Sequence, residues 1–211
     1  MKKAVVGFRV HSGWSAVVAV CLEKSAPVVL HRQRVQLVET FTYRFRQPYH
    51  TGEKMALAAA REFIAGVREQ GRELAYRAIH GLELELEGRG YRLTRGALLL
   101  ASGRPLLELE KILASHALIH TADGELFREC LLYASARCGL AVVSMREREL
   151  LEQAAKALHA PRPSLLRRVS ELGRPFGAPW SQDEKFATLA AWLAARASKK
   201  SIAKMSTGEP A

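Results

Sequence analysis

Residues 3–22, KAVVGFRVHSGWSAVVAVCL, decide how the chain begins to fold. Two valine-rich runs, residues 3–10 and 15–22, are separated by the tetrad HSGW at residues 11–14, which is typical of a tight turn. A third run of the same character, residues 27–38, follows after a short polar link. Because short links favour neighbouring antiparallel strands, the sequence predicts an antiparallel meander of three strands.

The next part of the chain alternates helical and strand-like patterns. Residues 53–70 carry apolar side chains at helical intervals, and Gly71 is expected to end this helix. Residues 73–87 alternate leucine with glutamate as a strand would, but both residue types are good helix formers, which favours a helix. Apolar runs at residues 91–101 and 140–145 predict two further strands, a buried strand and a short one.

The remaining segments predict helices that connect and cover this sheet. Residues 106–120 and 124–138 are expected to be helical, as one helix broken near Thr121. A last helix should begin at Ser181, because SQDE is a capping-box pattern. The prediction is therefore an α/β fold with a mixed sheet, three antiparallel strands at its amino-terminal end and helices on both faces. The sequence predicts a single domain over residues 1–197, followed by a disordered basic tail at 198–211.

Composition limits the classes of protein to consider. The chain has 211 residues, of which 48% are hydrophobic and 25% charged, as in an ordinary globular protein. Its net charge of +11 favours partners that carry phosphate, although a generally basic proteome would give the same charge. The 3 cysteines contain no C-x-x-C pair, which excludes a disulfide framework and fits the cytoplasm. No run approaches the roughly 20 apolar residues that a membrane span needs.

Two stretches carry a resemblance to a known superfamily. VVGFRVHSGWSAVVAV at residues 5–20 is similar to the strand, glycine-bearing turn and second strand that begin ribonuclease H-like folds. SQDEKFATLAAWLA at residues 181–194 resembles the acid-bearing, alanine-rich helix that ends resolvase-type nucleases. Together with the order of elements, these stretches resemble the ribonuclease H-like superfamily, which includes Holliday-junction resolvases and the lineage of actin-type ATPases. The resemblance implies that fold for roughly residues 3–197.

The resemblance also implies a metal site, from which this sequence departs. Such nucleases place an aspartate in the first strand to hold a divalent metal, and Arg9 stands near that position here. A guanidinium has no lone pair to offer a metal and would repel it. Asp183 matches the last acid of the family, but one acid does not make a two-metal site. The resemblance therefore implies the fold more than the activity.

A second group of chemically capable residues lies in SHALIHTADGELFR, residues 115–128. His116 and His120 are four residues apart, so on a helix both imidazoles share a face. With Glu125 they could ligate a divalent metal or act as a general acid and base. The alternative is that both histidines simply form hydrogen bonds at a helix end. The H-E-x-x-H pattern is absent.

Residues that suit a phosphate ligand occur elsewhere in the chain. Tyr43, Arg44 and Arg46 belong to FTYRFRQPYH, residues 41–50, where arginines that can neutralise phosphate alternate with aromatic rings that can stack on bases. The alternative is a structural loop with its aromatics packed on the sheet. The Ser12-Gly13 turn could offer amide donors, and Arg104 follows a predicted buried strand, where ligands of α/β proteins often bind.

The sequence thus predicts a cytoplasmic protein that binds nucleic acid or another polyphosphate through a ribonuclease H-like domain without an intact acid cluster. Two alternatives stay open. One is a metal-assisted phosphoester hydrolase, in which His116 and His120 serve as metal ligands or acid–base groups, Glu125 or Asp183 supplies a carboxylate, and Arg9 or Arg104 holds the phosphate. The other is a protein-interaction or structural module. The sequence does not decide among them, and it leaves the oligomeric state open.

Overall fold

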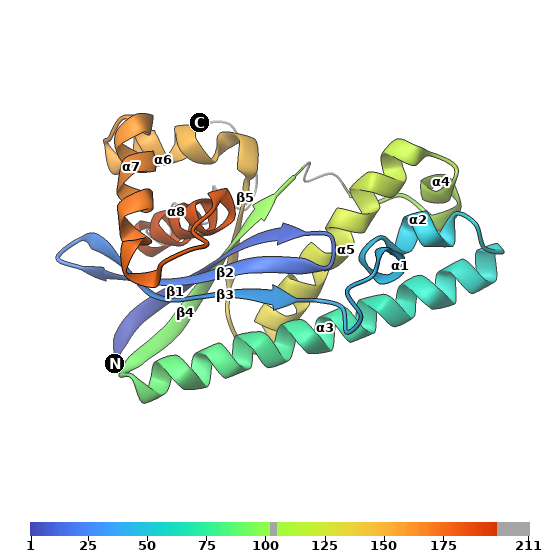
Figure 1. The fold of residues 1–211 in the computed structure, drawn as a ribbon, viewed down its shortest axis with the longest axis horizontal. Coiled ribbons are helices and arrows are strands. Elements are labelled where there is room, and N and C mark those ends of the chain that lie inside the picture. Colours follow the sequence, from blue (N-terminus) through green and yellow to red (C-terminus); the bar gives the residue numbers. More distant parts are fainter. Residues whose placement is uncertain (102–104, 198–211) are drawn as a thin grey trace.

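The computed structural model describes residues 1–101 and 105–197. Within these residues, five strands form a mixed sheet in the order β3-β2-β1-β4-β5 (Figure 1). The strands are β1 (Lys2–His11), β2 (Trp14–Glu23), β3 (Ala26–Gln36), β4 (Tyr91–Leu100) and β5 (Val142–Arg146). β2 is antiparallel to both β1 and β3, whereas β4 runs parallel to β1 and β5 parallel to β4. The predicted meander and both later strands are confirmed.

β1 is the central strand, and its apolar run from Ala4 to Phe8 reflects burial on both faces. Val6 and Phe8 enter one hydrophobic core, whereas Val5 enters the other. Gly7 also lies on the second face, where a Cβ atom would come within 2.0 Å of the Ala187 carbonyl oxygen. Glycine at this position therefore allows the last helix to pack directly against the centre of the sheet.

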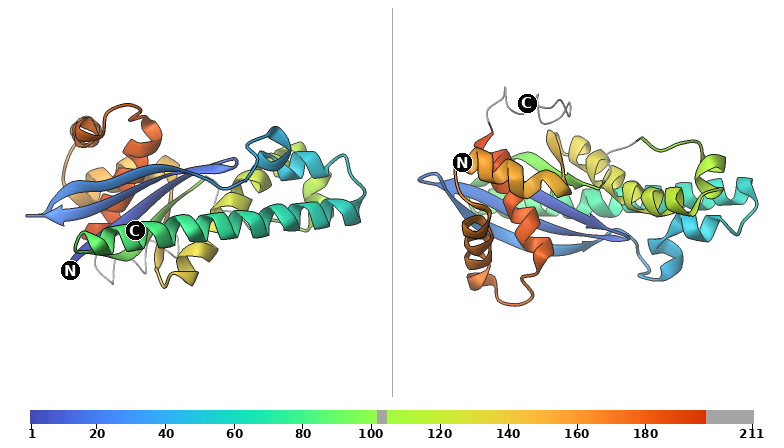
Figure 2. Two further views of the ribbon diagram at one scale, coloured as in Figure 1. Left: turned by 60° about the horizontal axis from the view of Figure 1, so that its bottom comes forward. Right: turned by 90° about the horizontal axis from the view of Figure 1, so that it is seen from above.

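Helices cover both faces of the sheet, as predicted (Figure 2). One face packs against α3 (Leu57–Gly88) and α5 (His116–Arg137). The other packs against α6 (Leu150–Leu158), α7 (Arg162–Leu172) and α8 (Gln182–Arg196). The short turn η1 (Glu147–Glu149) precedes α6, and η2 (Arg174–Phe176) lies between α7 and α8. α8 begins at Ser181 with the predicted capping box.

The prediction that Gly71 ends a helix is wrong, because Gly71 lies inside α3, which is 32 residues long. A Cβ atom at Gly71 would lie 2.9 Å from the Cys130 Sγ atom and 3.2 Å from the Leu37 carbonyl oxygen. The glycine therefore permits a close approach of α3 to α5 and to the segment after β3. The helical interpretation of residues 73–87 is confirmed, since they lie in the same helix.

The predicted break near Thr121 is also wrong. Thr121 lies inside α5, where its hydroxyl donates a hydrogen bond to the Ala117 carbonyl oxygen one turn earlier. The chain breaks instead between α4 (Leu109–Leu113) and α5, where Ser115 adopts an extended conformation with φ −140° and ψ 113°.

Short helices extend the molecule beyond one end of the sheet (Figure 1). They are α1 (Tyr43–Arg46), α2 (Pro48–Gly52) and α4, and they lie beside the first turns of α3 and α5. No helix in the described parts of the chain is long and apolar enough to cross a membrane. Arg104 and the predicted tail at 198–211 lie outside the described residues.

Candidate functional site

The parallel strands bring charged residues to one edge of the sheet. β1, β4 and β5 point the same way, so their carboxyl ends meet at this edge, where α/β proteins commonly bind ligands. Arg9 and His11 lie at the end of β1, and Glu147 directly follows β5. Asp183 lies in the first turn of α8, which crosses β1.

Arg9 holds two of the carboxylates at this edge, and we call Arg9, His11, Glu147 and Asp183 the Arg9 cluster. The Arg9 Nε and Nη2 atoms donate to the Glu147 carboxylate at 3.0 and 2.6 Å, which is a bidentate pair. Arg9 Nη1 donates to Asp183, and the His11 Nε2 atom lies 2.7 Å from the same Asp183 oxygen. The Arg9 side chain is only 15% exposed.

Within the Arg9 cluster, the pKa values of Asp183 and Arg9 are set by opposing effects of burial and of neighbouring charged groups. Burial alone would raise the pKa of Asp183, but hydrogen bonding and charge from His11 and from Arg9 outweigh burial and hold that pKa below its usual value. The hydrogen bonds to Glu147 raise the pKa of Arg9 against the opposing effect of burial. Arg9 and Asp183 therefore remain ionised at neutral pH.

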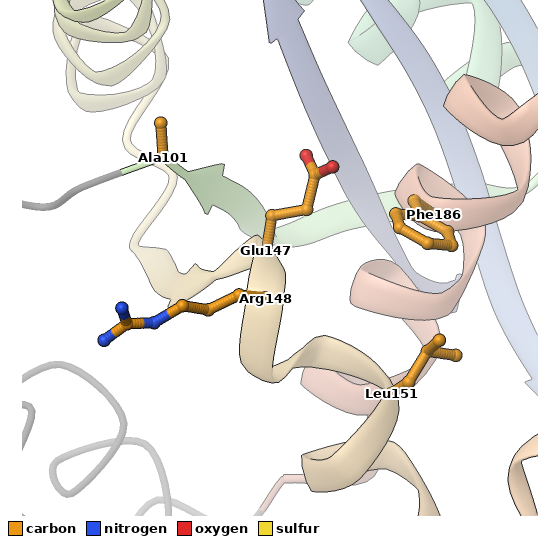
Figure 3. Close-up of a pocket in the computed structure, with 5 residues that line it drawn as sticks. All are labelled: Ala101, Glu147, Arg148, Leu151 and Phe186. Atoms are coloured by element: carbon orange, nitrogen blue, oxygen red, sulfur yellow. The ribbon is translucent and has the colours of Figure 1, made fainter. Parts of the chain in front are cut away.

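This arrangement does not fit the divalent metal that the nuclease resemblance implies. Both carboxylates that could ligate a cation accept hydrogen bonds from the Arg9 guanidinium instead. A metal would need lone pairs that Arg9 already occupies and would lie against a fixed positive charge. An open pocket of about 480 Å³ lies beside the cluster, lined by Ala101, Glu147, Arg148, Leu151 and Phe186. Figure 3 shows the Arg148 side chain pointing away from Phe186.

Glu125 lies apart from the histidines with which the sequence grouped it. At about 100° per residue, Glu125 is on roughly the opposite side of α5 from His116. Its carboxylate accepts a hydrogen bond from Arg128 Nη1 at 3.2 Å, and Arg128 Nε donates to the Leu99 carbonyl oxygen near the end of β4. Burial raises the pKa of Glu125, an effect that Arg128 opposes.

Arginines and aromatic rings alternate next to the Arg9 cluster, in a set we call the arginine–aromatic stack: Trp14, Arg34, Phe41 and Arg46. The guanidinium of Arg34 lies 3.9 Å from the centre of the Trp14 ring and 5.4 Å from that of Phe41. The guanidinium of Arg46 lies 4.5 Å from the centre of the Phe41 ring. The His11 and Trp14 rings stack at 4.4 Å, which joins the stack to the cluster.

The other predicted phosphate-binding residues in the described part of the chain lie on the turn after β1 and on α1. Arg46 covers the Ser12-Gly13 turn, since its Nε atom donates to the Ser12 carbonyl oxygen at 3.3 Å and its Cγ atom occupies the space above Gly13. Tyr43 and Arg44 are exposed on α1. Arg34 was not singled out in the sequence analysis. It lies on β3, and its guanidinium contacts Trp14 at the start of β2.

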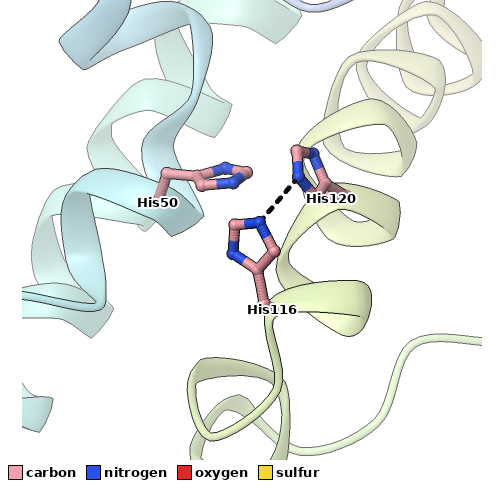
Figure 4. Close-up of side chains that lie close together, drawn as sticks. All are labelled: His50, His116 and His120. Carbon is pink, nitrogen blue, oxygen red and sulfur yellow. Dashed lines mark hydrogen bonds between the residues drawn. The ribbon is translucent and has the colours of Figure 1, made fainter.

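His116 and His120 do converge, and a third histidine joins them. Their Nε2 atoms are 3.1 Å apart, and the ring of His50 on α2 lies 4.4 Å from that of His120 and 5.3 Å from that of His116 (Figure 4). We call His50, His116 and His120 the histidine cluster. His50 was missed because it is far from the pair in sequence, and only the packing of α2 against α5 brings it there.

Comparisons with known proteins agree with this fold. No protein-family model matches the chain, and no curated protein matches its sequence. Solved structures do match it. Two structures of RuvC from Thermus thermophilus, one of them in complex with a Holliday junction substrate, are 14% identical with a TM-score of 0.51, over 92% of this chain and 93% of RuvC. The yeast mitochondrial Holliday junction resolvase Ydc2 is 13% identical with a TM-score of 0.50, over 91% of this chain and 78% of Ydc2. The chain therefore has the ribonuclease H-like fold of these resolvases.

Proposed function

We propose that this chain binds nucleic acid, with duplex or branched DNA as its ligand, at the edge formed by the arginine–aromatic stack and the Arg9 cluster. The observation that carries the proposal is the chain of contacts that runs from Arg9 through Asp183, His11 and Trp14 to Arg34. This track lies at the carboxyl edge of a sheet with the fold of Holliday junction resolvases.

The stack has the chemistry that a nucleic acid requires. Arg34 is exposed, and Arg46 is half-buried. Across residues 1–101 and 105–197, neither side chain forms a salt bridge with a carboxylate, so both keep their charge for a phosphate. The neighbouring rings pack against these guanidinium groups and hold them in place beside the turn. The net charge of +11 adds a long-range attraction to a phosphate backbone.

Because Arg9 lies at the same edge, we expect the chain to bind DNA without cleaving it. Phosphodiester hydrolysis in nuclease folds of this type relies on carboxylates that hold a metal, and here Glu147 and Asp183 are both paired with Arg9 instead. The cluster therefore acts as a fixed structural support beneath the binding surface.

Fluorescence anisotropy with a labelled four-way junction, a duplex and a single strand tests this proposal. Affinity should fall steeply with salt, because each phosphate contact releases counterions. Arg34→Ala and Arg46→Ala should each weaken binding and reduce the slope of log Kd against log salt by about 1. Arg77→Ala, which removes an exposed arginine on α3, is the matched control and should change the slope less. Equal effects of all three substitutions would contradict the proposed surface.

The second candidate function is metal-assisted hydrolysis of a phosphate ester at the histidine cluster. The convergence of three imidazoles favours it, because a metal held by imidazoles can activate a water molecule. Hydrolysis of bis(4-nitrophenyl) phosphate by zinc-loaded protein is the test, with loss of activity expected in His116→Ala. Turnover no faster than that of free zinc would exclude this function for that substrate class.

A further inference from the structure

The histidine cluster has the spacing of a metal site. Its three side chains each offer one ring nitrogen, and these nitrogens all lie within 4.8 Å of one another. In a tetrahedral zinc site with Zn–N bonds of 2.0–2.1 Å, two ligand nitrogens are about 3.3 Å apart. The 3.1 Å between the Nε2 atoms of His116 and His120 is close to that value. The third nitrogen lies within 4.8 Å of the other two and would move closer on binding an ion. Figure 4 shows the three imidazole rings gathered together.

Asp123 fixes the buried member of the cluster in the form that a metal needs. One carboxylate oxygen of Asp123 accepts a hydrogen bond from His50 Nδ1 at 2.5 Å, and the other accepts from the Tyr49 amide at 2.7 Å. With its proton on Nδ1, His50 presents the lone pair of Nε2. Most metal-binding histidines in proteins are held by a carboxylate or carbonyl group in this way.

The helix geometry gathers these groups on one side of α5. At about 100° per residue, His116, His120 and Asp123 fall within roughly 60° of one another around the helix axis. His50 and Asp123 are buried, whereas His116 and His120 are exposed. The cluster therefore has a rigid inner ligand and two outer ligands at the surface.

We propose that His50, His116 and His120 bind one Zn²⁺ ion, with Asp123 as the residue that positions His50. Imidazole nitrogen is a preferred ligand of zinc, and three protein ligands leave a fourth position for water or an anion. This fourth position faces solvent, on the side of the exposed histidines. The site is separate from the Arg9 cluster and does not depend on nucleic-acid binding.

Metal analysis of the full chain tests the proposal. After incubation with zinc and removal of free metal, elemental analysis should give one zinc per chain. His116→Ala and His120→Ala, which alter exposed residues, should lose it. His80→Ala removes another exposed histidine, on α3, and should retain one zinc per chain. Equal zinc content in wild type and in both cluster variants, or none in the wild type, would overturn the proposal.

Two further measurements separate a zinc site from a simple hydrogen-bonded histidine pair. Co²⁺ bound to the wild type should give the intense visible absorption of a four-coordinate site, and added zinc should abolish it. Asp123→Asn should weaken zinc affinity by about 10- to 100-fold, as measured by competition with a chromogenic chelator. Unchanged affinity in Asp123→Asn, in protein whose circular dichroism matches the wild type, would refute the role of Asp123.

Discussion

Replacement of Arg9 by methionine tests whether the Arg9 cluster supports the fold. The substitution keeps much of the side-chain volume but leaves Glu147 and Asp183 without their shared cation. Removing one partner of a buried ion pair costs about 3–5 kcal/mol, whereas an exposed pair contributes about 0–1 kcal/mol. The side chains of Arg9, Asp183 and Glu147 are 15%, 19% and 33% exposed, which places them between these limits but nearer the buried one. We expect a loss of about 2–3 kcal/mol in the free energy of unfolding, on the basis of those two ranges.

Urea denaturation measures this loss, and the midpoint should shift without a change in the slope m. In a thermal scan Tm should fall by roughly 5–10 °C for a chain of this size. Arg77→Met, in an exposed pair with Glu73, is the control and should cost less than about 0.5 kcal/mol. Addition of Mg²⁺ should raise the Tm of Arg9→Met but not that of the wild type, because only in the variant are Glu147 and Asp183 released from Arg9. A loss below about 1 kcal/mol, or one equal to that of the control, would refute the reasoning.

Four other substitutions test packing, helix propensity, capping and charge. Gly7→Ala should destabilise the protein by at least about 1–3 kcal/mol in urea denaturation, because its Cβ would collide with the Ala187 carbonyl oxygen. Gly66→Ala, with open space around it in α3, should instead raise stability by about 0.5–1 kcal/mol. Ser181→Ala should cost about 1 kcal/mol by removing the cap of α8. The folded-state pKa of Asp183 is lowered, so its stabilisation is present above the unfolded pKa and is lost as the pH falls through the folded value. The wild type should therefore lose more stability than Asp183→Asn as the pH is lowered below about 4.

The strands could be predicted from sequence because their signals are local. Valine-rich runs and short turns determine neighbouring antiparallel strands, and the order of elements then suggests the sheet. Errors arose where a residue serves a distant contact. Glycine is typical of a helix end, yet Gly71 lies within α3. A glycine occurs there because Cys130 and Leu37 approach the helix closely at that point. Such contacts join residues far apart in the chain, and no local pattern reports them.

The residues of the candidate sites also differ in whether a local sequence signal marks them. Arg9 and Asp183 could be named from the sequence, because the resemblance marked their positions. Glu147 was missed as a site residue, although it directly follows a predicted strand, and parallel strands bring their carboxyl ends together. His50 gave no spacing signal at all, since it reaches the other two histidines only through the packing of α2 on α5.

The most direct test of the proposed function measures binding and cleavage of a labelled four-way DNA junction in one reaction with Mg²⁺. The account predicts a complex that weakens steeply with salt and is unaffected by a chelator, with the DNA strands remaining intact. Absence of binding at low salt would contradict it. So would Mg²⁺-dependent strand cleavage that is lost in Glu147→Gln, because that carboxylate would then serve a metal rather than Arg9.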